Sequence, residues 1–135
     1  MIQRIQSIYL LVASILMALT FVLPFGQLND FNLTATHNIG LMAVAGISIA
    51  FNLFIIFQFN DRKKQMMLAN IALLIPVIFY GLAHVVANQD NIVAVSFDKM
   101  NYGFPLAGLA MLFIFLAKNA IQKDHKLVNS TDRLR

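Results

Sequence analysis

Four long apolar segments, separated by short polar ones, dominate the pattern of hydrophobic and polar positions along this chain. The segments cover residues 5–23, 39–59, 66–87 and 102–120. Each has roughly the 20 residues that a helix needs to cross a bilayer. Their apolar cores contain no Asp, Glu, Lys or Arg. The pattern predicts an all-α membrane protein, with a four-transmembrane-helix bundle in residues 1–122 and a polar tail in residues 123–135.

The basic residues are distributed unequally about these segments. The turn between the second and third segments carries Arg62, Lys63 and Lys64, and most of the others lie near the two ends of the chain. Nine of the ten Lys and Arg residues thus fall on one side of the predicted membrane, and Lys99 alone falls on the other. Because positive residues beside membrane spans favour the cytoplasmic side, we expect the turn and both termini to be cytoplasmic.

The two segments expected on the outer side each contain a short run that favours β-structure. Residues 31–36 alternate apolar and polar side chains for most of their length, and residues 92–97 are rich in β-branched and aromatic types. We predict that these runs pair as a small two-stranded extracytoplasmic cap over the helix ends. Such a ribbon needs the bundle beneath it for stability.

Composition supports the membrane assignment and removes several classes of function. Of the 135 residues, 59% are hydrophobic and 12% are charged, compared with averages of about 45–50% and 25% in soluble proteins. The net charge of +4 lies in short segments beside the apolar runs, which favours contact with anionic lipid headgroups over nucleic acid. The sequence contains no Cys, which excludes a thiol nucleophile, a disulfide and a thiolate metal site.

Few residues within the apolar segments carry candidate chemistry. His84 lies within an apolar segment, one helical turn after Tyr80. It fits contact with a quinone or haem, a protonation switch or, as we favour, a neutral structural histidine near the outer interface. Asn52 and Asn70 are predicted to hydrogen-bond across the bundle. We expect no catalytic residue, no cofactor and no metal site.

The polar tail is longer and more patterned than membrane orientation alone requires. Leu127, Val128 and Leu134 are interspersed among charged residues, as in a surface helix or a docking peptide. For the central turn, orientation alone is a sufficient explanation. The residues expected to set topology, or to contact lipid or a protein partner, are Arg62, Lys63, Lys64, Lys126, Arg133 and Arg135.

Several stretches of the chain resemble those of one known family. They are the start MIQRIQSIYLL (residues 1–11), the turn NDRKKQ (60–65), the stretch YGFPL (102–106) and the closing residues 126–128 and 132–135. Over its whole length the chain resembles a family of small Bacteroidetes membrane proteins catalogued as domain of unknown function 4293. The resemblance implies four helices, a bacterial inner membrane and no assigned activity, and it supplies no catalytic residues.

Two classes of function fit these observations. The first is a non-catalytic accessory or scaffold subunit of an inner-membrane complex, which contacts a protein partner through its tail and small-residue helix faces. The alternative is a binder or carrier of a small apolar molecule such as a quinone, with His84, Tyr80 and Asn70 lining an intrabundle pocket. An enzyme is not expected, because the spans hold no carboxylate and no cluster of histidines.

Overall fold

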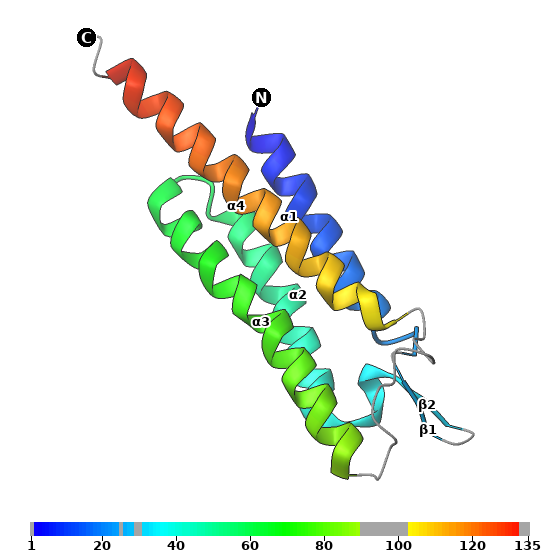
Figure 1. The fold of residues 1–135 in the computed structure, drawn as a ribbon. Coiled ribbons are helices and arrows are strands. Elements are labelled where there is room, and N and C mark those ends of the chain that lie inside the picture. Colours follow the sequence, from blue (N-terminus) through cyan, green and yellow to red (C-terminus); the bar gives the residue numbers. More distant parts are fainter. Residues whose placement is uncertain (1, 25, 29–30, 90–102, 133–135) are drawn as a thin grey trace.

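The computed structural model contains four α-helices and a short β-hairpin (Figure 1), and it describes residues 2–24, 26–28, 31–89 and 103–132. Strands β1 (Gly26–Leu28) and β2 (Phe31–Leu33) follow the first helix, and a 3-10 helix, η1, covers Ala35–His37. The α-helices are α1 (Ile2–Leu19), α2 (Ile39–Phe57), α3 (Arg62–Gln89) and α4 (Phe104–Asp132). The predicted series of four helices is confirmed.

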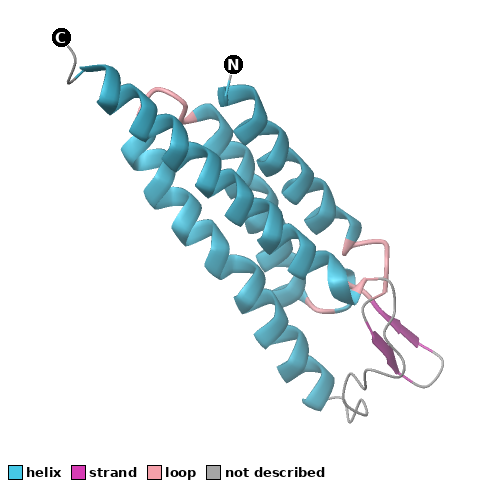
Figure 2. Ribbon diagram, turned by 45° about the horizontal axis from the view of Figure 1, so that its top comes forward, coloured by secondary structure: helices cyan, strands magenta, loops and turns pink. Residues whose placement is uncertain are grey.

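The helices form a bundle in which consecutive helices run antiparallel. α1 packs against α2 and α4, and α3 packs against the same two helices, so α1 and α3 occupy opposite corners. Figures 1 and 2 place the start of α1, the α2–α3 turn and the end of α4 together, and the β1–β2 hairpin at the opposite end. We name the first the basic end, which carries Arg62, Lys63, Lys64, Lys123 and Lys126, and the second the hairpin end.

Alanine is buried at the contacts of all four helices. Ala13 of α1, Ala45 of α2, Ala72 of α3 and Ala110 of α4 are each 0% exposed. Such small side chains let helix backbones approach closely, which is how helices pack when both solvent and core are apolar. Larger side chains fill the remaining core, among them Leu10, Met17, Leu41, Ile55, Phe79 and Ile114.

The exterior of the bundle is also apolar. Ile8 of α1, Ile47 of α2 and Leu74 of α3 are 57%, 57% and 59% exposed. Several polar side chains are found inside, where Gln6 and Asn52 are 2% and 1% exposed. Soluble proteins rarely expose apolar patches of this extent around a core that contains polar groups.

Among the residues that the structure describes, three helical segments are long and apolar enough to cross a membrane. They are Ile39–Phe57, Arg62–Val86 and Pro105–Val128. The apolar part of α1, Ile5–Leu19, is shorter than these three segments and is not among them. The regular helix of α1 ends at Leu19 and not at the predicted residue 23, because Thr20 begins a tight turn in which its hydroxyl donates to the Met17 carbonyl oxygen at 2.7 Å.

Two helices extend beyond the spans predicted from hydropathy. α3 begins at Arg62 and not at residue 66, because Asp61 caps its first turn. α4 continues through Asp132, although we predicted its end near residue 120. Most of the predicted tail is therefore a helical extension of α4, and Figure 1 shows it projecting past the other helices.

The strand pairing differs from the predicted cap. β2 forms within the predicted run 31–36, but it pairs antiparallel with β1, with Gly26 opposite Leu33 and Leu28 opposite Phe31. The other predicted strand, residues 92–97, lies outside the described residues. The cap is thus not seen in the described part of the chain. A hairpin between neighbouring segments closes a much shorter loop, so it loses less chain entropy than the predicted pairing.

The start of α4 is fixed against the segment that follows α1. The Gly103 N–H donates to the Pro24 carbonyl oxygen at 2.9 Å, and Gly103 is buried. A Cβ atom at Gly103 would lie 2.5 Å from the Pro24 carbonyl oxygen and 2.6 Å from the Leu23 carbonyl oxygen. Only glycine fits this junction without a shift of the backbone.

Replacement of Gly103 by alanine is expected to destabilise the bundle by about 1–3 kcal/mol, because the methyl group would meet backbone carbonyls. Gly81→Ala is the matched control, since a Cβ atom at Gly81 would meet nothing within 4 Å. Alanine should there stabilise the helix by about 0.5–1 kcal/mol. Thermal unfolding of both variants in detergent measures the difference. Equal midpoints would contradict the close packing at Gly103.

Candidate functional site

The α2–α3 turn is held by side chains that cap both helices. Asp61 Oδ1 accepts the backbone N–H of Lys64 at 3.1 Å, and Asp61 Oδ2 lies 3.4 Å from Lys64 Nζ. The Lys64 N–H is the largest cause that lowers the pKa of Asp61 below its ordinary value, and the Lys64 ammonium adds to it. The Gln65 side-chain amide donates to the Ile55 carbonyl oxygen at 3.2 Å, near the end of α2. The turn is therefore a capped structure as well as a carrier of positive charge.

An ion pair joins the start of α3 to the extension of α4. Arg62 Nε lies 3.1 Å from Asp124 Oδ2, and the two side chains are 27% and 13% exposed. Close by, the Gln122 side-chain amide lies 3.8 Å from the Met66 sulfur atom, which joins the same two helices. These contacts fasten the first turn of the extension to the bundle.

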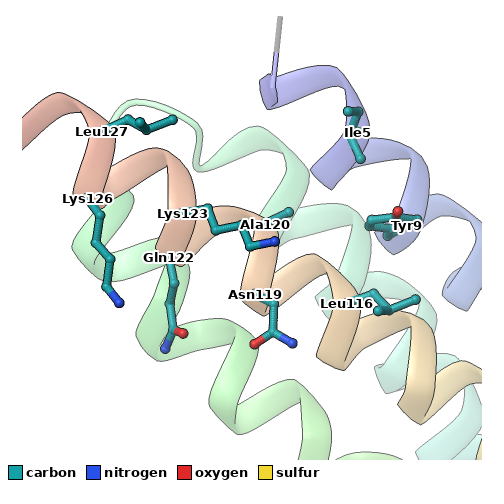
Figure 3. Close-up of a pocket in the computed structure, with 9 residues that line it drawn as sticks. All are labelled: Ile5, Tyr9, Leu116, Asn119, Ala120, Gln122, Lys123, Lys126 and Leu127. Atoms are coloured by element: carbon teal, nitrogen blue, oxygen red, sulfur yellow. The ribbon is translucent and has the colours of Figure 1, made fainter.

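A groove of about 580 Å³ lies between α1 and α4 at the basic end (Figure 3). Figure 3 shows Lys123 and Leu127 extending from α4 toward α1, while Gln122 and Lys126 lie along the adjoining face of α4. The groove has an apolar part, where α1 meets the middle of α4, and a polar part nearer the end of the bundle. Its lining residues are Ile5, Tyr9, Leu116, Asn119, Ala120, Gln122, Lys123, Lys126 and Leu127.

The polar part of this groove carries positive charge. Lys123 and Lys126 are exposed, and neither forms an ion pair with any acidic residue that the structure describes. Asp124, which lies between them in the sequence, is paired with Arg62. The amide of Asn119 adds N–H donors. Since the lining residues include neither a carboxylate nor a histidine, the arrangement suits the binding of an anion and not acid–base catalysis.

Comparison with known proteins identifies the family of the chain. A family model described as a domain of unknown function (DUF4293) matches residues 2–134, which is nearly the whole length. The chain belongs to the DUF4293 family. No curated protein and no solved structure matches this DUF4293 protein. Its function must therefore be inferred from its own residues.

The three residues that we expected to line an interior pocket of the DUF4293 bundle do not meet in one. Asn70 and His84 are exposed on α3. Tyr80 is half-buried, and its hydroxyl accepts the backbone N–H of Gly108 on α4 at 2.8 Å. Gly108 suits this contact, because a Cβ atom there would lie 3.2 Å from the Tyr80 hydroxyl oxygen. Tyr80 thus acts as a contact between α3 and α4.

The predicted hydrogen bond between Asn52 and Asn70 is not formed. Asn52 is buried on α2, but the described residues provide no hydrogen-bond partner for either of its polar side-chain atoms. Asn70 is exposed, so the two amides face different environments. The prediction was wrong because the apolar residues of α3 surround the whole helix and leave its rotation undetermined.

The basic residues singled out from the sequence fall into three groups. The first group lies in the α2–α3 turn, where Arg62 pairs with Asp124 and Lys64 pairs with Asp61, and where Lys63 is exposed. Lys126 lines the groove. Arg133 and Arg135 lie outside the described residues.

Most of the groove was not predicted from the sequence. Leu116, Ala120, Lys123 and Leu127 have the spacing of one helix face, but that spacing becomes meaningful only if the helix continues past residue 120. A search for Gly and Pro would have revealed the continuation, since residues 109–132 contain neither. The part that Ile5 and Tyr9 take in the groove could not be predicted, because they are ordinary residues of an apolar helix.

The variants Arg62→Gln and Asp124→Asn form a double-mutant cycle that tests the ion pair. We expect a coupling free energy of about 0.5–1 kcal/mol, because the pair is only partly exposed. Arg62→Gln alone should destabilise more than the double variant, since it leaves a largely buried carboxylate without its partner. Unfolding in detergent gives the free energies, and hydrogen exchange of residues 121–128 gives the local effect. Additive free energies with unchanged exchange would contradict a fastening role.

Proposed function

We propose that this DUF4293 protein is an integral protein of a bacterial cytoplasmic membrane whose four helices all cross the bilayer. The apolar exterior supports this placement. Exposed side chains such as Ile47 and Leu74 are unfavourable in water but are well solvated by the hydrocarbon of a bilayer. α1 is the shortest of the helices, and its 18 residues cover about 27 Å, close to the thickness of the hydrocarbon layer.

The proposed orientation places the basic end in the cytoplasm. Arg62, Lys63 and Lys64 lie at this end together with the extension of α4. Because such residues resist transfer across the membrane, the turn and both termini of the bundle stay on the cytoplasmic side.

Fusions of alkaline phosphatase test this orientation. A fusion after Gln65 is expected to be inactive and a fusion after Asn88 active, since the enzyme works only outside the cytoplasm. Replacement of Arg62, Lys63 and Lys64 by glutamine should reduce the difference, because it removes the charges that hold the turn inside. An active fusion after Gln65 in the unaltered chain would contradict the orientation.

Within this frame we propose a non-catalytic accessory or scaffold role in a membrane complex. The length of α4 is the observation that carries the proposal. Its 29 residues cover about 43 Å, so about 13 Å of helix extends beyond a hydrocarbon layer of about 30 Å. This length exceeds what anchoring requires, and Figure 1 shows the excess projecting past the other helices. A projecting helix offers a soluble or membrane-bound partner a rigid surface.

The extension also has the composition of a docking surface. Leu127 and Val128 are 54% and 38% exposed, and Lys126 lies beside them in the sequence. Mixed apolar and charged surfaces of this kind are typical of protein interfaces outside the membrane. Within the membrane, Gly46 of α2 has no neighbour within 4 Å of its Cβ position, which leaves room for a helix of another protein.

Site-specific photocrosslinking in the native host tests the docking role. A photoreactive side chain at Val128 is expected to give one protein adduct of defined mass, because this position faces the partner. The same side chain at Leu74, which is exposed on α3, is the control and should give lipid adducts.

A truncation provides the second arm of this experiment. Removal of residues 127–135 retains Asp124 and its ion pair, so membrane insertion should be unchanged while co-purification of the crosslinked partner is lost. Lipid adducts alone at Val128, or equal recovery of the partner without residues 127–135, would contradict the docking role.

A further inference from the structure

We propose that the groove between α1 and α4 binds one anionic phospholipid of the cytoplasmic leaflet. This inference rests on the membrane placement proposed above. It concerns a defined site on the protein surface, in addition to the general attraction between basic residues and anionic membranes.

The groove lies at the depth where a phospholipid changes from acyl chain to headgroup. A helix crosses the hydrocarbon layer in about 20 residues, so counting from Pro105 at the start of α4 brings Lys123 and Lys126 to the headgroup level. Leu116 and Tyr9, which line the apolar part, lie deeper in the bundle. The polarity of the groove therefore changes in the same direction as that of a lipid.

The charges of the groove select an anionic headgroup. Arg62 holds Asp124 at 3.1 Å, which removes the acidic residue closest in sequence from interaction with the groove lysines. Lys123 and Lys126 are left without an acidic partner among the described residues. Ammonium groups together with the Asn119 amide donate hydrogen bonds to phosphate oxygens, and such charged hydrogen bonds are stronger than neutral ones.

An apolar track continues from the groove toward the middle of the membrane. Leu112 and Leu109 precede Leu116 on the same face of α4 and are 51% and 43% exposed. An acyl chain can lie along these side chains while the headgroup occupies the polar part. The volume of about 580 Å³ is within the range of small-molecule sites, so it accommodates one headgroup and the start of its chains.

Lipid retention by the full-length protein tests the site. The protein is reconstituted in vesicles of phosphatidylglycerol and phosphatidylcholine and extracted in mild detergent, and bound lipid is counted by native mass spectrometry. The double variant Lys123→Gln/Lys126→Gln is expected to retain phosphatidylglycerol about tenfold less, as for the loss of one charged hydrogen bond. Retention of phosphatidylcholine should stay the same.

Two further variants separate a site from general surface charge. Lys63→Gln/Lys64→Gln removes the same charge from the same end of the bundle, but neither residue lines the groove. It should leave phosphatidylglycerol retention unchanged. Ala120→Phe keeps both lysines and fills the groove, so it should lower retention as the lysine variant does.

The outcomes distinguish this inference from the membrane placement. Equal losses in the two lysine variants, or full retention in Ala120→Phe, would overturn the groove site. Displacement of phosphatidylglycerol by inorganic phosphate at equal concentration would show a phosphate site and overturn the lipid. Release of the protein from membranes by alkaline carbonate would overturn the membrane placement itself, whereas failure of lipid retention alone leaves that placement intact.

Discussion

The apolar exterior of the bundle is the constraint on which the other features depend. Side chains such as Ile8 and Leu74 face outward, so hydrocarbon and not water surrounds the middle of the helices in the proposed membrane. Charged groups are costly at that depth, and those of the described residues gather at the basic end of the bundle. The chemistry of the described residues is consequently concentrated at the basic end, where Arg62, Lys123 and Asp124 meet the surface.

The same constraint explains why several polar side chains of α1 and α2 are found inside. Ser48 and Asn52 lie one turn apart on α2 and are fully buried, as is Gln6 on α1. In hydrocarbon, a polar side chain that turned outward would have only acyl chains around it, whereas inside the bundle it lies among other helices, although Ser48 Oγ and both polar atoms of Asn52 have no hydrogen-bond partner among the described residues. Burial of these side chains therefore favours one rotation of α1 and α2 about their axes. A hydrogen bond between two helices, where one forms, stabilises a membrane protein by about 0.6 kcal/mol. The Ser14 hydroxyl finds its hydrogen-bond partner within α1, because it donates to the Leu10 carbonyl oxygen at 2.9 Å.

Hydropathy predicted the existence and order of the helices, and it failed where local chemistry or helix rotation decides. Asp61 and the residues that follow it set the start of α3, and this cap was readable from the sequence. The sequence did not show which way Asn70 and His84 face. A helix that is apolar on all sides has no hydrophobic stripe to indicate which side is buried. The β1–β2 hairpin was not predicted, because the alternation in residues 31–36 indicates a strand but not which segment it pairs with.

The partition of charge at the basic end links the fold to the proposed roles. If Asp124 were turned toward Lys123, the groove would keep only one of its two positive charges, and the extension of α4 would lose its ion pair with α3. The observed pairing with Arg62 instead uses one positive charge to hold the extension and leaves two lysines for an anion. The anchoring of the extension and the positive charge of the groove therefore follow from a single contact. A lipid in the groove would in turn brace α1 against α4 beside that contact, and so steady the surface that is proposed to meet a partner.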